Sequence, residues 1–404
     1  MLLKESPGMS EKNDPLEFII AEATPWNGRN SEACIFPLLD GRLVLTWSHW
    51  THGSQHDHAP AEIRAKFSSD LGGTWSDSIL WQGHGHYHAV EDPSLARLPS
   101  GKIGFCYFAR LGEQFGNEDH FYQSVFTFFR RSDDEGETWN DPIMMNPEGM
   151  MRTYTQLDTL RVSNSGRLIK PVCLLWRDPL IPDEVSRVLV LYSDDEGDTW
   201  KFSNGLVVEE ARDFEAASEA CAEQFSDGTW FMTIRNSTGR AFVSYSTDDG
   251  ANWSKPEPAP LASSASPVMI RRIPDTDHLL TVWNQVSPNE IRAGHPRHRL
   301  SCAITKDRGK TWEHHRNLES QDTCRYVEPE AVEGPIIRPS HVRGHTPLTA
   351  DDTDHELTGA YWTNCSYPSI LFHEGFAFIT YDVSNRDTLC SLKFRRIPME
   401  WFYE

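Results

Sequence analysis

Five copies of one short motif constrain the fold of this chain more than any other feature. Each copy reads Ser/Thr-x-Asp-x-Gly-x-Thr/Asn-Trp. The copies lie at 68–75, 132–139, 193–200, 246–253 and 305–312, roughly 50 to 65 residues apart. A regular period of this length is typical of folds in which every repeat is one supersecondary unit. The chain is therefore expected to be a repeat protein.

The residue types in the motif are those of a hairpin turn. The Asp accepts backbone N–H groups, the Gly supplies a positive φ, and the Ser or Thr satisfies neighbouring backbone groups. The Trp is expected to pack the turn against its own repeat. A second hairpin signal, a Gly flanked by Asp or Ser between apolar runs, recurs at Gly41, Gly101, Gly166 and Gly228.

Two hairpins per repeat make a four-stranded blade. Over 404 residues this period predicts an all-β, six-bladed β-propeller that occupies 1–404 as one domain. We expect residues 17–21 to pair with 392–396 and close the ring.

Composition narrows the functional classes. The formal net charge of −21 argues against nucleic-acid and anionic-membrane partners, which require positive patches. The eight cysteines include no C-x-x-C pair, so neither a metal site nor a disulfide framework is expected, and no cofactor is predicted. The first residues carry no apolar leader segment, which favours a cytoplasmic protein. A homo-oligomer is left open.

The five motifs are similar to the Asp boxes (BNR repeats) of the sialidase, or neuraminidase, superfamily. That resemblance implies catalytic residues outside the boxes. Asp57 stands in the loop before the first box, where the superfamily carries its acid/base Asp. Glu219 precedes a D-G hairpin and resembles the Glu that activates a nucleophilic Tyr, with Glu223 as an alternative in the same strand. Tyr367, in the sequence Cys-Ser-Tyr-Pro-Ser, matches that nucleophile.

The resemblance also implies arginines that bind a substrate carboxylate. Arg235 and Arg299 match two of them, with Arg297 as the less favoured substitute for Arg299. The superfamily's first arginine directly precedes an Ile-Pro pair, whereas here Arg29 comes several residues early and Glu32 stands nearby. We therefore assign Arg29 and Glu32 to substrate binding and expect a sugar held by fewer arginines than sialic acid.

Three histidines lie at alternating positions in a stretch interpreted as a strand, at His84, His86 and His88. Alternation would put them on one face, so His86 and His88 are predicted to contact sugar hydroxyls rather than a metal. Arg161 is predicted to line the same mouth, as are Arg152, Tyr154, Gln156 and Asp158. Residues 321–360 are read as an insertion that covers the pocket or meets a neighbouring subunit.

These assignments together predict a retaining exo-glycosidase that removes a terminal sugar from a glycan, an acidic sugar being one candidate. A neutral Tyr nucleophile suits an acidic sugar, because an anionic one would be repelled by the substrate carboxylate. Two alternatives remain open: a lyase acting on uronate residues, and a propeller that binds glycans without catalysis.

Overall fold

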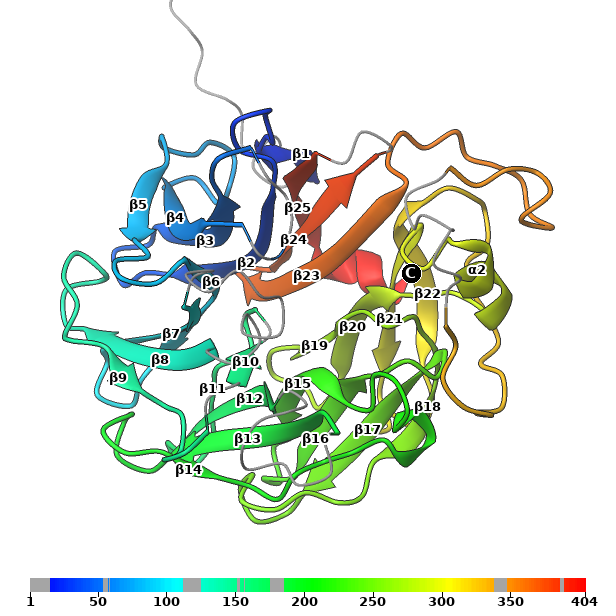
Figure 1. The fold of residues 1–404 in the computed structure, drawn as a ribbon. Helices are drawn as coiled ribbons and strands as arrows, with labels where there is room; N and C mark the ends of the chain where they lie inside the picture. Colours follow the sequence, from blue (N-terminus) through cyan, green and yellow to red (C-terminus); the bar gives the residue numbers. More distant parts are fainter. Residues whose placement is uncertain are drawn as a thin grey trace, which may run out of the picture.

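The strands surround a central axis as a ring of antiparallel sheets (Figure 1). The computed structural model describes residues 15–53, 57, 59–111, 125–150, 153–155, 157–174, 185–337, 347–385 and 389–404. Within these residues the predicted all-β propeller arrangement is confirmed. The short helical segments are η1 (Glu209–Ala211), α2 (Pro288–Ala293) and η2 (Met399–Tyr403).

Four sheets stand as separate blades. The first has the order β10 (Thr153–Thr155), β12 (Leu168–Leu174), β13 (Arg187–Ser193) and β14 (Lys201–Phe202), with β11 (Arg161–Val162) beside β12. The second and third follow chain order: β15 (Ser218–Gln224), β16 (Trp230–Arg235), β17 (Arg240–Ser246) and β18 (Glu257–Ala262), then β19 (Val268–Arg272), β20 (Leu279–Asn284), β21 (Arg299–Thr305) and β22 (Glu313–Ser320).

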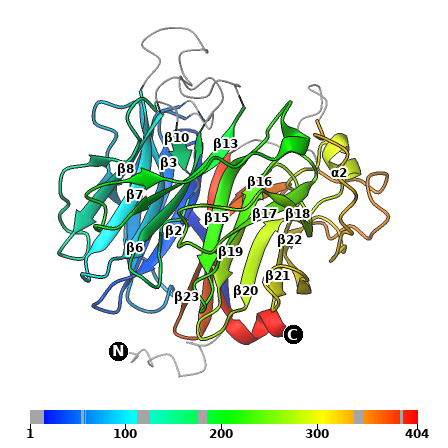
Figure 2. The same cartoon turned by 90° about the horizontal axis from the view of Figure 1, so that it is seen from below.

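The fourth separate blade closes the ring. It comprises β23 (Asn364–His373), β24 (Phe376–Ser384), β25 (Cys390–Pro398) and the N-terminal strand β1 (Leu16–Ala21). The expected closure is confirmed, since β1 runs antiparallel to β25 with Glu17 opposite Arg395 and Phe18 opposite Phe394. In the view turned by 90° from that of Figure 1, the C-terminus and η2 lie at the end of the strands away from α2 (Figure 2).

The other strands form one eight-stranded sheet. It contains β2 (Asn30–Pro37), β3 (Leu43–Trp50), β4 (Ala61–Ser68), β5 (Ile79–Gln82), β6 (Ala89–Arg97), β7 (Ile103–Arg110), β8 (Val125–Ser132) and β9 (Ile143–Met144). The described strands therefore pair as four separate blades and this sheet, not as the six separate blades predicted. A single parallel pair, Ala61 with Ala89, joins its halves. Both alanines are fully buried, and their small side chains let the two strands approach.

The repeated turns have the predicted hydrogen bonds. In the second copy Asp134 Oδ1 accepts from Ser132 Oγ at 2.7 Å and from the Thr138 backbone N–H at 2.8 Å. These bonds stabilise the ionised carboxyl, and the Thr138 side chain contributes most to lowering the pKa of Asp134 to about 2. The box carboxylates are thus committed to their turns.

Three box tryptophans contact rings beyond their own repeat, and Trp139 also packs on its own repeat, as expected, with its ring 5.1 Å from Phe105. The Trp75 ring lies 5.4 Å from Phe394, Trp139 lies 5.5 Å from Trp81, and Trp200 lies 5.4 Å from Phe129, all edge-on. Aromatic pairs at such separations stabilise by more than their buried area alone. These three boxes therefore connect their own repeat to the next one.

Candidate active site

The inner strands of successive blades contact one another around the axis. Strand β2 contacts β6 and β23, and β15 contacts β12 and β19. Four of these inner strands carry a register shift near their start, which leaves an extra residue on the strand and re-aims its side chain. The shifts lie at Glu32, at Asp92 with Pro93, at Glu219, and at Tyr367 with Pro368. Hence four sequence-distant positions present polar side chains at one level of the ring.

Tyr367 and Glu219 meet across this ring. The Tyr367 hydroxyl donates to Glu219 Oε1 at 3.2 Å. Arg235 Nη1 donates to the same hydroxyl at 3.3 Å and also to Glu219 Oε2. Tyr367 has a φ of +52°, a conformation that costs a non-glycine residue energy and that clusters at functional sites. The strand is thus strained at the residue whose hydroxyl contacts the carboxylate.

Burial is the main reason that the pKa of Tyr367 is raised above its ordinary value, and the Glu219 carboxylate adds to the shift. The guanidiniums of Arg235 and Arg297 oppose it. The phenol is therefore neutral near pH 7. A base must remove its proton before it can attack an electrophile, and Glu219 is in hydrogen-bond contact to do so.

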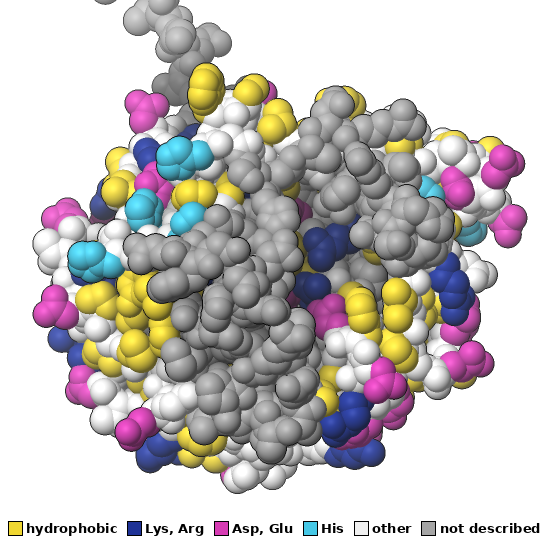
Figure 3. All heavy atoms as spheres, viewed as in Figure 1, with side chains coloured by type: hydrophobic (Ala, Val, Ile, Leu, Met, Phe, Trp, Pro, Cys, Tyr) yellow, Lys and Arg dark blue, Asp and Glu magenta, His cyan; other side chains and the backbone are white. Residues whose placement is uncertain are grey.

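Three arginines surround the Tyr367 ring. Arg235 is held between Glu219 and Glu215, whose carboxylate lies 2.7 Å from Arg235 Nε. Arg297 Cζ lies 5.2 Å from the ring centroid, and Arg29 Cζ lies 5.9 Å from it. Lys or Arg side chains and acidic side chains meet in a hollow near the middle of this face (Figure 3).

Arg29 links the N-terminal strands to the site. Its guanidinium forms ion pairs with Glu32 and Asp57 and lies 4.1 Å above the Trp50 ring. Glu32 is 3 % exposed, whereas the Asp57 side chain is 69 % exposed. The structure therefore places Arg29 beside Tyr367 and pairs it with Glu32 and Asp57, although Arg29 stands too early in the sequence to match the family pattern.

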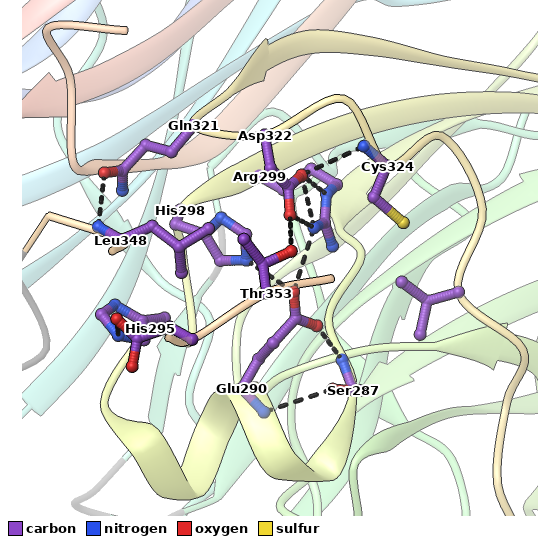
Figure 4. Close-up of polar contacts among 12 residues, drawn as sticks. Ser287, Glu290, His295, His298, Arg299, Gln321, Asp322, Cys324, Leu348 and Thr353 are labelled. Carbon is purple, nitrogen blue, oxygen red and sulfur yellow. Dashed lines mark hydrogen bonds and ion pairs between the residues drawn. The ribbon is translucent and has the colours of Figure 1, made fainter. Parts of the chain in front are cut away.

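Arg299 does not reach Tyr367. It is fully buried and donates to Asp322 Oδ1 at 2.7 Å and Oδ2 at 2.8 Å, and to Glu290 at 3.0 Å (Figure 4). Thr353 donates to Asp322 as well, so this cluster ties residues 321–337 and 347–360 to α2 and β21. The less favoured Arg297 occupies the position beside Tyr367, because the Cys365 backbone N–H donates to the Arg297 carbonyl at 2.9 Å.

The histidine stretch is a turn rather than a strand. Tyr87 N–H donates to the His84 carbonyl at 2.9 Å, Gly85 has a φ of +58°, and β6 begins only at Ala89. His84 and His86 are exposed, and His88 is half-buried. The predicted alternation on one face is therefore wrong, because the glycine turns the chain. Arg152 and Gln156 lie outside the described residues.

Arg161 lies in a closed buried network instead of lining an open mouth. It bonds to Glu223 and to the Asp158 carbonyl, the latter at 2.8 Å. Arg271 bonds to Asp158 Oδ2 at 2.9 Å, so two arginines neutralise two carboxylates. Glu223, the alternative to Glu219, is thus paired with Arg161 and Arg271 in this network.

Sequence reasoning missed Glu91, Asp92 and Arg110. Glu91 is buried and bonds to Arg110 at 2.8 Å, and burial is the main cause that raises its pKa to about 7. Asp92 shares the feature that marks Tyr367, a positive φ of +58° followed by Pro-Ser. The sequence signal that could have revealed Asp92 is its Asp-Pro-Ser context, which parallels the Tyr-Pro-Ser context of Tyr367. Both residues lie in a bulge of an inner strand.

A cavity of about 540 Å³ opens beside Arg235. Its lining comprises Tyr154, Cys173, Val185, Ser186, Arg212, Asp213, Phe214, Glu215, Ser218 and Arg235. The Tyr154 and Ser218 hydroxyls lie 2.6 Å apart. A small polar ligand that reached Tyr367 would therefore have room on the Arg235 side. In the described part of the chain no three metal-ligating side chains come together, and no helix has the length and apolarity to cross a bilayer.

Comparisons with known proteins agree with the repeat architecture. A family model described as a BNR repeat-like domain matches residues 21–379. A sialidase of Clostridium perfringens is 24 % identical over 217 residues, covering 48 % of this chain and 54 % of that protein. The chain thus spans about half the length of the curated relatives it matches.

Solved structures show the same fold. Trypanosoma rangeli sialidase in complex with the inhibitor DANA has a TM-score of 0.64 at 15 % identity, covering 95 % of this chain and 59 % of that chain. The intramolecular trans-sialidase from Ruminococcus gnavus has a TM-score of 0.63 at 13 % identity, covering 95 % and 99 %. At these identities the likeness concerns the architecture.

Proposed function

The chain belongs to the sialidase-like family of BNR repeat-like domains, and from this premise we propose that it is a retaining exo-glycosidase for a carboxylate-bearing terminal sugar. The contact of Tyr367 with Glu219 at 3.2 Å carries the proposal. It supplies a neutral nucleophile and its base in one hydrogen bond. We also propose that the eight-stranded sheet represents two joined blades, which would give six around the axis.

The roles of the side chains follow from charge. Tyr367 attacks the anomeric carbon while Glu219 takes its proton, so no anionic nucleophile faces the substrate carboxylate. Asp57, exposed at the rim, protonates the leaving oxygen and then activates water. Arg29, Arg235 and Arg297 bind the carboxylate. With three arginines beside Tyr367, sialic acid becomes the first substrate to test, despite the expectation of fewer arginines.

Replacing the nucleophile tests the proposal. Tyr367→Phe removes the attacking oxygen, and we expect kcat on the best aryl glycoside of a sialyl and uronyl panel to fall roughly 10³-fold or more. Tyr381→Phe is the matched control, because Tyr381 is also a buried tyrosine that donates to a glutamate, Glu319 at 2.8 Å. Steady-state kinetics on both variants provide the measurement.

The products separate the alternatives. A retaining hydrolase consumes water and releases the sugar with its anomeric configuration kept, which proton NMR detects. An unsaturated, ultraviolet-absorbing product would instead identify a lyase, and saturable glycan binding without turnover would identify a binding propeller. Undiminished turnover by Tyr367→Phe would remove Tyr367 from the mechanism.

A further inference from the structure

Glu32 has half of its carboxylate unsatisfied. Oε1 bonds to Arg29, but Oε2 is buried and has no hydrogen-bond partner among the described residues. Glu32 lies in the β2 bulge with a φ of +43° and is 3 % exposed. A buried carboxylate oxygen without a donor is costly, and protonation reduces that cost. The position therefore favours the neutral acid.

The charges around Glu32 favour the same form. The titratable groups that act on it or respond to it come from several elements: Arg29 and Asp57 from loops, Glu91 and Asp92 from β6, Tyr367 from β23, Asp382 from β24 and Cys390 from β25. Four of these are carboxylates and one is a cation. Burial is the main cause that raises the pKa of Glu32 to about 8; Arg29 opposes the shift and Asp382 adds to it.

Arg29 has its guanidinium divided between two carboxylates. One terminal nitrogen bonds to Glu32 and the other to Asp57. If both were ionised, their two negative charges would exceed the charge of Arg29, and an incoming carboxylate would be repelled. The Asp57 side chain is exposed, so that solvent can stabilise its charge, whereas Glu32 is buried. The proton on Glu32 therefore decides how much positive charge Arg29 offers to a ligand.

We propose that Glu32 is a positioning residue whose proton keeps Arg29 available for a substrate carboxylate near neutral pH. When Glu32 ionises, Arg29 is neutralised and no longer attracts that carboxylate. This inference rests on the proposed function, because it assumes that Arg29 contacts the carboxylate. The proton lost at higher pH passes to solvent, and the negative charge it leaves is retained by Glu32 beside Arg29.

The affinity of carboxylate sugars tests this role. Free sialic acid and glucuronic acid are the probes, titrated by calorimetry from pH 6 to pH 9. Both probe carboxylates stay ionised over this range. We expect the dissociation constant to be level below the Glu32 pKa and to rise toward about tenfold per pH unit above pH 8.

Two variants separate the role of Glu32 from a general effect of pH. In Glu32→Gln the rise above pH 8 should vanish, because the amide cannot ionise. In Glu62→Gln, which removes a carboxylate bonded to Arg64 on β4, the rise should persist. A wild-type profile without a rise would overturn the proposal, as would a rise that remains in Glu32→Gln.

Infrared spectroscopy supplies a readout that needs no ligand. A protonated-carboxyl band that disappears near pH 8 in the wild type and is missing in Glu32→Gln would support the buried acid. Its absence from the wild type would refute it. If the band is found but neither sugar acid binds, the proposed control of carboxylate binding by Glu32 is wrong. Turnover of the aryl glycosides then shows separately whether the glycosidase proposal fails.

Discussion

Arg297 and Arg299 show how two residues in one segment acquire different environments. They are two positions apart, so strand alternation places both on the same face and cannot separate them. Arg299 begins β21 and is fully buried against Asp322, whereas Arg297 precedes the strand and lies over the Tyr367 ring. The sequence favoured Arg299 over Arg297 for the site. The structure reverses this preference, because Arg299 pairs with Asp322 and Arg297 lies beside Tyr367.

Arg297→Ala is expected to affect binding more than stability. Losing a charged hydrogen-bond donor should weaken the affinity for a carboxylate sugar roughly 10- to 100-fold. The melting temperature should change little, because Arg297 lies outside the buried Asp322 cluster. Calorimetric titration and thermal unfolding of the same preparation measure both effects. Unchanged carboxylate affinity would exclude Arg297 from the binding set.

Arg299→Ala is expected to do the reverse. It leaves Asp322 buried without its cation, and breaking a buried pair on one side typically costs about 3–5 kcal/mol. Urea unfolding of the purified variant gives the value. A loss of less than about 1 kcal/mol would mean that water or another group replaces the guanidinium.

At the scale of elements, each box glycine is a point of close contact between two repeats. A Cβ added to Gly197 would lie 2.2 Å from the Phe129 ring on β8. At the other four box glycines it would lie 2.4 to 2.7 Å from a side chain of another repeat: Phe394 for Gly72, Trp81 for Gly136, Ile169 for Gly250 and Phe231 for Gly309. The motif therefore requires Gly for two reasons, its positive φ and the close approach of the neighbouring side chain.

Gly197→Ala separates these two requirements when compared with Gly101→Ala. Both glycines have a positive φ, +92° and +88°, but a Cβ at Gly101 meets no atom within 4 Å. Gly101→Ala should cost only the backbone strain, about 1–2 kcal/mol. Gly197→Ala should cost about 1–3 kcal/mol more, because it also overpacks the contact with Phe129. Equal costs in urea unfolding would show that the contact relaxes freely.

At the scale of the whole molecule, the ring is closed by segments from opposite ends of the chain. Strand β1 covers the edge of β25, which would otherwise be open to pairing with another chain. Inner strands from different blades contact one another and carry the candidate site, so the closure and the site share one framework. The geometry at Tyr367 thus depends on residues hundreds of positions away.

Ile20→Asp tests whether closure stabilises the entire ring. Ile20 in β1 is 5 % exposed, and a carboxylate there would be buried without a partner. We expect a single unfolding transition whose free energy of unfolding is lower by about 3 kcal/mol or more. We also expect aggregation through the edge of β25 that β1 no longer covers. Glu22→Asp, an exposed neighbour, should leave the transition in place. A separate early transition confined to one blade would contradict the coupling.

The sequence by itself determined the repeat, its turn chemistry and the closing strand pair. The repeat and its turns are periodic and local, because a turn needs Asp and Gly at fixed offsets and a regular period implies like units. The closing pair follows from them, because a ring of such units brings the two ends of the chain together. Family resemblance added Asp57, Glu219, Arg235 and Tyr367. In the fold Glu219 and Arg235 contact Tyr367, and Asp57 pairs with Arg29.

Only the tertiary structure decided which charges face one another. It placed Arg29 and Arg297 beside Tyr367 and Arg299 against Asp322. It also turned the chain at His84–Tyr87 and joined the halves of the eight-stranded sheet through Ala61 and Ala89. The physical reason is that a bulge shifts the alternation of a strand by one residue, so the face a side chain takes depends on its cross-strand partner. Spacing along one chain does not contain that information.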